Sequence, residues 1–193
     1  METIKLSKTT IEKAVKVISR GGVIICHSDT VYGLVCDAGN KKALEKIFKI
    51  KKRPKTKPLG VFVRDIEMAK ELVVISEFQE KFLKKNTPGK VTVILEKRKD
   101  CKLISLVGTK TTVGIRIIKS KFINELLEKL GMPLAQTSAN ISGQPVTTEI
   151  KEALKQFEGS RIKPDLVVDA GDLPKSRPSA IIDLTHNKAK ILR

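Results

Sequence analysis

Apolar residues follow two patterns in this sequence, and the two patterns alternate along most of the chain. Short apolar runs between turn residues are typical of buried strands, whereas apolar residues three and four positions apart indicate amphipathic helices. Helices are predicted from Thr9 to the Gly21-Gly22 pair and at residues 41–50, 66–72, 76–85, 122–130 and 148–157. Strands are predicted at residues 23–26, 59–63, 91–95, 113–118, 134–137, 166–168, 180–184 and 189–192. This alternation predicts an α/β protein with helices packed on a twisted, mixed β-sheet.

Local signals mark the ends of several predicted elements. Thr9 followed by Glu12, and Ser76 followed by Gln79, have the spacing of a capping box at a helix start. Gly131 is expected to end the helix at residues 122–130. Residues 97–110 are polar and contain glycine, which predicts a mobile surface loop.

Length and composition favour one domain over residues 1–193, with 40% apolar and 31% charged residues. Cys26, Cys36 and Cys101 are odd in number and lack the close spacing of a zinc site, so we expect reduced thiols in a cytoplasmic protein. Residues 1–13 do not have the apolar core of a secretory signal, and no apolar run is long enough to cross a membrane.

The net charge of +17 predicts an anionic partner, which can be RNA, DNA, a nucleotide or an acidic lipid. The charge is densest at residues 41–57, where nine basic residues accompany one acid. Two prolines restrict the end of this run, and in an extended segment Lys51 and Arg53 project to the same side, with Lys57 able to close over the same pocket. Guanidinium and ammonium groups suit phosphate oxygens, although a solvated basic face is the alternative.

A charged residue, Arg116, interrupts the apolar strand predicted at residues 113–118. A charge in such a strand needs a partner. The carboxylate or phosphate of a ligand can be that partner, and so can Asp183 or a glutamate.

Two polar segments follow predicted strands, where open α/β sheets bind ligands. They are residues 27–34, with Ser28, Asp29 and Thr30, and residues 137–145, which are rich in small hydroxyl and amide side chains. Each can instead be a hydrogen-bonded turn. Neither a Walker loop nor a Gly-x-Gly-x-x-Gly motif is present, and no histidine pair has metal-site spacing. We assign no general acid or base. Hydroxyl, amide and cationic groups favour phosphoryl or nucleotidyl transfer through positioning and charge stabilisation.

Six segments in order, covering nearly the whole chain, resemble the YrdC-like family of threonylcarbamoyl-AMP synthases. They are Asp29-Thr30-Val31-Tyr32-Gly33-Leu34, Lys51-x-Arg53-Pro54 with Pro58-Leu59, Pro88-Gly89-x-Val91-Thr92, Val113-Gly114-Ile115-Arg116, Ser138-Ala139-Asn140-x-Ser142-Gly143 and Pro178-Ser179-x-Ile181-Ile182-Asp183. The resemblance implies a YrdC-like fold and a nucleotidyltransferase that joins L-threonine, bicarbonate and ATP into threonylcarbamoyl-AMP and releases pyrophosphate. It also implies a downstream threonylcarbamoyl transferase complex that modifies tRNA.

The resemblance further implies site residues. Thr30, Arg116 and Ser179 are expected to hold threonine, with Arg116 on its carboxylate. ATP is expected to contact Lys51, Arg53, Lys57, Thr112, Ser138, Asn140 and Arg193, and Mg²⁺ is expected on its phosphates.

Some positions depart from the family pattern. His27-Ser28 replaces the usual Pro-Thr, Phe62 stands where many members have a histidine, Thr87 replaces an aromatic residue and Ala180 replaces a threonine. Because the sequence ends at Arg193, we expect the short, single-domain form of the family.

A different class of function is also compatible with the charge, namely a non-catalytic module that binds double-stranded RNA or tRNA. Such a module predicts affinity that falls steeply with salt and is indifferent to ATP. The six Phe and one Tyr offer no clear stacking platform for bases, which speaks against it. A third reading is carbamoyl-adenylate chemistry in hydrogenase maturation, which by resemblance belongs to much longer chains.

Overall fold

Strands far apart in the sequence form one mixed sheet in the computed structural model, which describes residues 1–7, 9–186 and 188–193. Within these residues the strand order is β1-β8-β2-β3-β7-β4-β6-β5-β9-β10. The strands are β1 (Glu2–Lys5), β2 (Ile24–His27), β3 (Tyr32–Asp37), β4 (Gly60–Val63), β5 (Val91–Glu96), β6 (Thr112–Ile117), β7 (Leu134–Ser138), β8 (Leu166–Asp169), β9 (Ala180–Asp183) and β10 (Lys190–Ile191). Pairs β1–β8, β2–β8, β4–β6 and β5–β9 are parallel, and the other neighbours are antiparallel. The predicted α/β class with a mixed sheet is confirmed.

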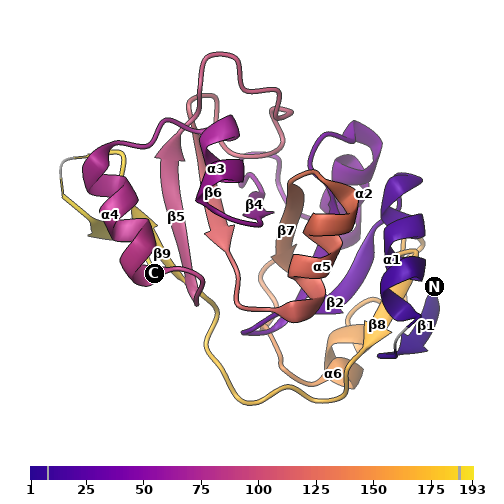
Figure 1. Ribbon diagram of the computed structural model, residues 1–193. Coiled ribbons are helices and arrows are strands. Elements are labelled where there is room, and N and C mark those ends of the chain that lie inside the picture. Colours follow the sequence, from indigo (N-terminus) through magenta and orange to yellow (C-terminus); the bar gives the residue numbers. More distant parts are fainter. Residues whose placement is uncertain (8, 187) are drawn as a thin grey trace.

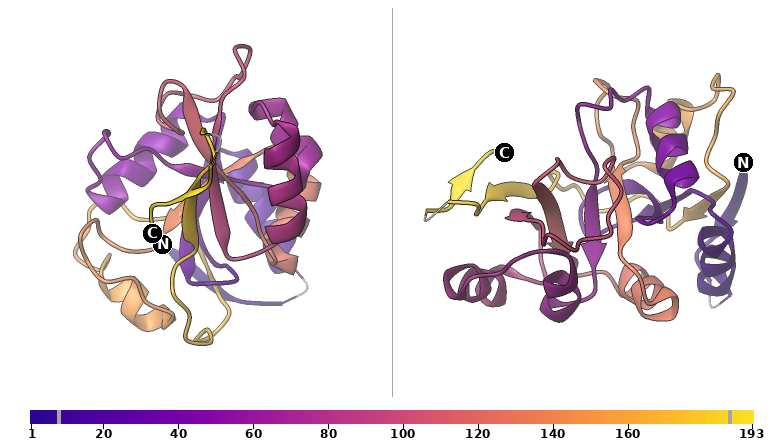
Figure 2. Two further views of the ribbon diagram at one scale, coloured as in Figure 1. Left: turned by 90° about the vertical axis from the view of Figure 1, so that its left-hand side faces the viewer. Right: turned by 90° about the horizontal axis from the view of Figure 1, so that it is seen from above.

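The helices lie on both faces of the sheet. They are α1 (Thr10–Ser19), α2 (Lys41–Lys51), α3 (Ile66–Leu72), α4 (Glu77–Asn86), α5 (Lys121–Leu130) and α6 (Ile150–Lys155). Helices α1, α3, α4 and α5 form a row on one face, and α2 and α6 lie on the other (Figures 1 and 2). The sparser α2/α6 face leaves the middle of the sheet free for a site.

The core between the layers is mainly aliphatic. The strands β2, β3 and β6 and the inner faces of α1, α2 and α5 supply side chains of Ile, Leu and Val that are almost fully buried. Tyr32 is also fully buried, and its hydroxyl donates to the Gly171 carbonyl at 2.5 Å and accepts from the Ala170 amide at 3.1 Å. These contacts fix the loop after β8 against the start of β3.

The predicted end signals are confirmed at α4 and α5 and wrong at α1, and α6 is shorter than the helix predicted at residues 148–157. Ser76 and Gln79 form the predicted capping box at α4, and Gly131 ends α5 in the left-handed conformation. The capping box predicted at Thr9 is wrong, because Thr9 makes no side-chain cap bond among the described residues. The hydroxyl of Thr10 instead accepts from the Ser7 amide at 2.8 Å and donates to a carbonyl of β1 at 3.0 Å.

Two strands, β1 and β3, were not predicted. β1 is a polar edge strand with one half-buried residue, Ile4, so its sequence lacks an apolar run. β3 begins inside the segment interpreted as a polar turn, and Gly33 interrupts its apolar pattern. Pairing with β2 and β7 on both sides stabilises it.

Residues 97–110 contain no helix or named strand, in agreement with the predicted loop. The loop is fastened at several points, however. The Lys97 ammonium donates to the carbonyls of Val107 at 2.7 Å and Thr109 at 2.9 Å. Val107 is fully buried and pairs with Leu59, which precedes β4. The loop therefore has a defined position beside β4, and its mobility stays a prediction.

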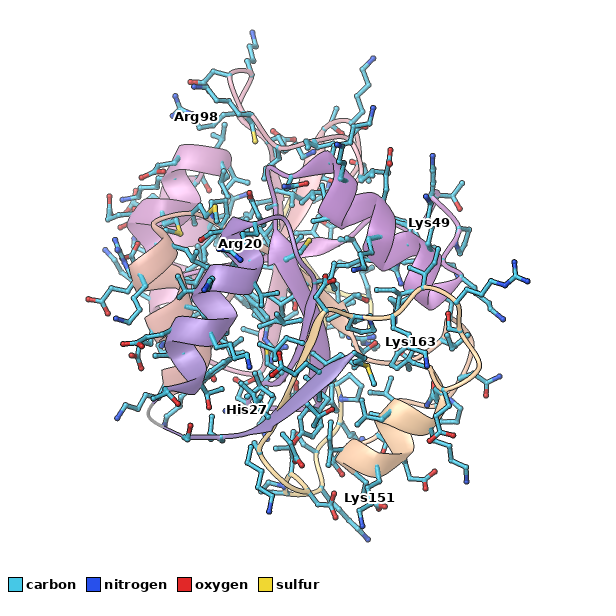
Figure 3. All side chains as sticks on the ribbon, turned by 90° about the vertical axis from the view of Figure 1, so that its right-hand side faces the viewer. Arg20, His27, Lys49, Arg98, Lys151 and Lys163 are labelled. Carbon is cyan, nitrogen blue, oxygen red and sulfur yellow. The ribbon has the colours of Figure 1, made fainter. Side chains whose placement is uncertain are left out.

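The described residues contain no helix that is long and apolar enough to cross a membrane. All three cysteines are free thiols, as predicted. Basic side chains such as Lys49 and Lys151 lie at the outer edge of the molecule, consistent with a strongly positive surface (Figure 3).

Candidate active site

A pocket lies over the middle of the sheet and contains most of the predicted site residues. Its lining includes seven of them, namely Thr30, Arg53, Thr112, Arg116, Ser138, Ser179 and Arg193. The lining does not include Lys51, Lys57 or Asn140. These seven residues come from β6 and β7, from the segments that follow β2 and α2, from the residue before β9 and from the end of the chain after β10. The fold thus brings together residues that are up to 163 positions apart, from Thr30 to Arg193.

Arg116 forms one end of the pocket. Its guanidinium is buried, with Nη2 paired to the Asp29 carboxylate and 3.3 Å from the Thr30 hydroxyl. The group also lies 5.8 Å from the centre of the Phe62 ring, which is a favourable position for a cation. The Nε–H is buried and has no hydrogen-bond partner among the described residues. A buried donor without a partner at the edge of a pocket is a candidate contact for an anionic ligand group.

The partner of Arg116 within the chain is therefore Asp29, and the suggested Asp183 is wrong. Asp183 instead accepts from the amide and hydroxyl of Thr185 at 2.9 and 2.7 Å. Burial lowers the pKa of Arg116, the Asp29 carboxylate opposes that shift, and nearby Arg193 adds to it. An arginine starts from so high a pKa that the group stays cationic at neutral pH.

Hydroxyl groups surround this end of the pocket in two pairs. The hydroxyls of Ser28 and Thr30 lie 3.0 Å apart, and those of Thr92 and Ser179 also lie 3.0 Å apart. Arg193 donates from Nη2 to the Ser179 carbonyl at 3.0 Å, which holds the end of β10 beside the pocket. A cation flanked by hydroxyl groups suits a small molecule with a carboxylate and further polar groups.

Arg53 lies toward the opposite end of the pocket and organises the loop after α2. Its Nε donates to the Lys57 carbonyl at 2.6 Å, and its Nη2 donates to the Pro58 carbonyl at 3.0 Å. Burial lowers the pKa of Arg53. The Lys57 side chain is exposed. Lys57 therefore contributes its backbone carbonyl to this arrangement and not its ammonium group. Arg53 thus combines a positive charge in the pocket with a role in shaping the loop.

The structure corrects the expected position of Lys51. It is the last residue of α2 rather than part of an extended segment, and Lys52 follows in the left-handed conformation with φ of 49°. The Lys51 side chain therefore points inward and is 1% exposed. Its ammonium donates to the carbonyl of Ser138 at 2.6 Å and to the carbonyl and side-chain oxygen of Asn140 at 2.6 and 2.9 Å. These bonds hold the loop after β7 against the end of α2.

Asn140 has a similar supporting position. Its side-chain oxygen accepts from Lys51 and, at 2.7 Å, from the Ser138 hydroxyl. Its side-chain nitrogen donates to the carbonyls of Ile141 at 3.0 Å and Gln144 at 2.7 Å. These bonds satisfy the whole amide, and Ser138 at the end of β7, rather than Asn140, lines the pocket.

Between the two ends the floor is formed by glycines, a feature that the sequence interpretation did not identify. Gly60 on β4 and Gly114 on β6 lie side by side, and a Cβ placed on Gly60 would lie 3.1 Å from the Gly114 carbonyl oxygen. Gln136 on β7 also lines the pocket and was not predicted. Gln136 is the first polar residue after the buried Leu134 and Ala135 of β7, and this change from apolar to polar is the signal in the sequence that pointed to it.

His27, which begins the polar segment at residues 27–34, lies at the end of β2. Its ring packs against Phe122 of α5, with the ring centres 5.2 Å apart. Burial lowers the pKa of His27. His27 therefore lies on the face of the sheet that is covered by α1, α3, α4 and α5, and not in the pocket. The described residues also contain no cluster of three His, Cys, Asp or Glu side chains able to hold a metal ion.

A model of the Sua5/YciO/YrdC family, described as "telomere recombination", matches residues 16–193, so the chain belongs to this family. A protein of Methanocaldococcus jannaschii, provisionally named threonylcarbamoyl-AMP synthase, is 36% identical over 186 residues, which cover 96% of this chain and 86% of that protein. The protein YciO of Escherichia coli strain K12, named as uncharacterized, is 30% identical over 183 residues, covering 95% of this chain and 87% of that protein.

The fold is also that of a solved family member. The crystal structure of Sua5 from Pyrococcus abyssi in complex with L-threonine matches with a TM-score of 0.89 and 29% identity. The match covers all of this chain and 56% of the Sua5 chain, so this chain spans about half the length of that relative. The relatives named threonylcarbamoyl-AMP synthase bear the name of an enzyme of the nucleotidyltransferase type.

Proposed function

We propose that the protein makes threonylcarbamoyl-AMP from L-threonine, bicarbonate and ATP. In this reaction the threonine nitrogen forms a bond to the bicarbonate carbon with loss of water. A carbamate oxygen then bonds to the α-phosphorus of ATP, and pyrophosphate leaves. The product serves the threonylcarbamoyladenosine modification of tRNA, through a separate transferase complex. Family membership and the names of the relatives support this assignment.

The observation that carries the proposal is the buried Arg116–Asp29 pair in the pocket lining, in which the Arg116 Nε–H has no partner among the described residues. Asp29 holds the guanidinium in place, and the remaining donors can bind the carboxylate of an amino acid. Thr30 and Ser179 then supply hydroxyl groups beside the bound amino acid. The complex of P. abyssi Sua5 with L-threonine supports threonine as that amino acid.

The nucleotide fits the other end of the pocket. Thr112 precedes Arg116 by four residues on the same face of β6, which separates them by about 13 Å. That span accommodates an amino acid, a one-carbon unit and a phosphate in line. Arg53, Thr112 and Ser138 offer one charge and two hydroxyls to the phosphates and ribose. The residues act by holding the reactants in line and by stabilising charge, and none is assigned as a general acid or base.

Mg²⁺ is proposed to enter with the triphosphate, whose oxygens and bound water are its usual ligands. Among the described residues Asp29 lies near the pocket but is already paired with Arg116, so the chain itself supplies little of a metal shell. When bound, the ion neutralises charge on the leaving pyrophosphate. A cytoplasmic location is part of the same proposal, because tRNA modification takes place there.

Ligand binding gives a first test. ATP should raise the thermal unfolding midpoint, and threonine should raise it further because the two ligands share one pocket. Arg53→Ala should weaken ATP binding at least tenfold through lost charge and a loosened loop. The matched control is Lys55→Ala, because Lys55 is exposed on the same loop and should leave ATP binding unchanged. Equal ATP affinity in both variants would contradict the assigned nucleotide end.

Binding of tRNA or double-stranded RNA is a second candidate function, favoured by the net charge of +17. The exposed lysines on the outer face of α2 can contact a phosphate backbone without involving the pocket. We expect any such affinity to fall steeply between low and physiological salt and to be unaffected by ATP. An RNA affinity without any ATP binding would replace the enzymatic assignment.

A further inference from the structure

The side chain of Gln136 lies across the glycine floor of the pocket. Its amide nitrogen is 3.1 Å from the point where a Cβ on Gly60 would stand. The same point is 3.1 Å from the carbonyl oxygen of Gly114. A larger residue at position 60 would therefore crowd the amide, and the absence of a side chain there allows Gln136 to reach over β4.

The sheet register places this amide between the two ends of the pocket. Gln136 on β7 pairs with Gly60 on β4, and two residues further along β4 Phe62 pairs with Arg116. In the opposite direction, Thr112 lies two residues beyond Gly114 on β6. Two residues along a strand correspond to about 7 Å. Measured along the strands, Gln136 thus lies about 7 Å from the level of Arg116 and about 7 Å from the level of Thr112.

The amide is also available for a ligand. Gln136 is half-buried and lines the pocket, and its side chain makes no hydrogen bond to any described residue. A glutamine amide offers two N–H donors and one carbonyl acceptor. Bicarbonate has the complementary groups, because it combines anionic oxygens that accept with one hydroxyl that donates.

We propose that Gln136 binds the bicarbonate and orients the one-carbon unit between the amino acid and the α-phosphate. This inference rests on the proposed function, because the reaction requires that unit to lie between its two partners. The amide N–H donates to a bicarbonate oxygen, and the amide carbonyl accepts from the bicarbonate hydroxyl. An adenine edge can also pair with a glutamine amide. The base of ATP, however, is separated from the α-phosphorus by the ribose, whereas the carbamate oxygen bonds to the α-phosphorus directly, so a position midway between Arg116 and Thr112 fits the one-carbon unit better.

The test distinguishes an effect on bicarbonate binding from effects on threonine and ATP binding. Product formation is measured in CO₂-depleted buffer with bicarbonate varied and with threonine and ATP saturating, for the wild type, Gln136→Ala and the near-isosteric Gln136→Met. We expect the bicarbonate KM to rise about tenfold in both variants, which is the loss of about one hydrogen bond. The threonine KM and the ATP Kd should stay within twofold of the wild type. Thermal unfolding midpoints close to the wild type exclude misfolding.

An unchanged bicarbonate KM, or a rise confined to the ATP Kd, would overturn the assignment of Gln136 while leaving the proposed function intact. A wild-type protein that forms no product at any bicarbonate concentration would instead overturn the proposed function and this inference together.

Substitution of Gly60 provides an independent test of the same proposal. Gly60→Ala should displace the amide and also raise the bicarbonate KM, and the double variant with Gln136→Ala should be no worse than the poorer single variant. Gly159→Ala is the matched control, because a Cβ at Gly159 meets no atom within 4 Å and the residue has no positive φ. Losses that add in the double variant would show that Gly60 does not act through the amide and would overturn that part of the inference.

Discussion

Replacing Lys51 by methionine should destabilise the protein and change how its stability depends on pH. Lys51 is 1% exposed, and its ammonium donates to three oxygens of Ser138 and Asn140. Methionine is similar in length but cannot donate, so it leaves three buried acceptors without this donor. At about 1 kcal/mol for each of the three lost hydrogen bonds, the free energy of unfolding should fall by about 3 kcal/mol at neutral pH.

The pH dependence follows from the pKa of Lys51. Burial and the charge of nearby Arg53 lower it from 10.5 to about 7. Between these two values the unfolded chain binds a proton that the folded chain has released, so this group makes stability rise with pH. The slope approaches about 1.4 kcal/mol per pH unit within that window and vanishes below pH 7, where both states are protonated. The advantage of the wild type over Lys51→Met should therefore grow between pH 7 and pH 9.

Urea denaturation at several pH values between 6 and 9.5 measures this difference, because contributions shared by both proteins cancel. Lys49→Met is the matched control, since Lys49 lies on the exposed side of the same helix (Figure 3). It should be close to neutral and show no growing difference. Curves of unfolding free energy against pH that stay parallel for the wild type and Lys51→Met would contradict a buried Lys51 with a lowered pKa.

Further predictions concern the two ends of the pocket. Arg116→Lys keeps the charge but loses the guanidinium fork, so the threonine KM should rise at least tenfold with the ATP Kd unchanged in steady-state and binding assays. Asp29→Asn should raise the threonine KM by a smaller factor, because the arginine loses its charged partner; an unaltered KM would contradict this tether. Lys97→Met should accelerate proteolysis within residues 97–110, because two bonds that fasten the loop are lost. The exposed neighbour serves as its control, and Lys99→Met should be cut at the wild-type rate.

Elements whose signals are local were predictable from the sequence. The Ser76–Gln79 capping box and the glycine at 131 set the ends of α4 and α5 by contacts within a few residues. β3 depends on partners far away in the sequence, because Gly33 breaks its apolar pattern and pairing with β2 and β7 compensates. The edge strand β1 has little apolar character and is defined by its neighbour β8.

The candidate site was predictable in its residue types and less so in its geometry. Arg116 was conspicuous as a charge in an apolar strand, but its partner Asp29 lies 87 residues away and could not be inferred from spacing. The interpretation of Lys51 depended on an extended backbone. One more helical residue and the left-handed Lys52 reverse the direction of its side chain. Gln136 acquires its position only when β7 pairs with β4.

The most direct test of the proposed activity is product detection by mass spectrometry. Purified protein is incubated with ATP, Mg²⁺, L-threonine and ¹³C-labelled bicarbonate, and each component is omitted in turn. Threonylcarbamoyl-AMP carrying one ¹³C atom, together with an equal amount of pyrophosphate, should form only in the complete mixture and should be lost in Arg116→Ala. Absence of the labelled adenylate from the complete mixture, with ATP shown to bind, would contradict the assignment.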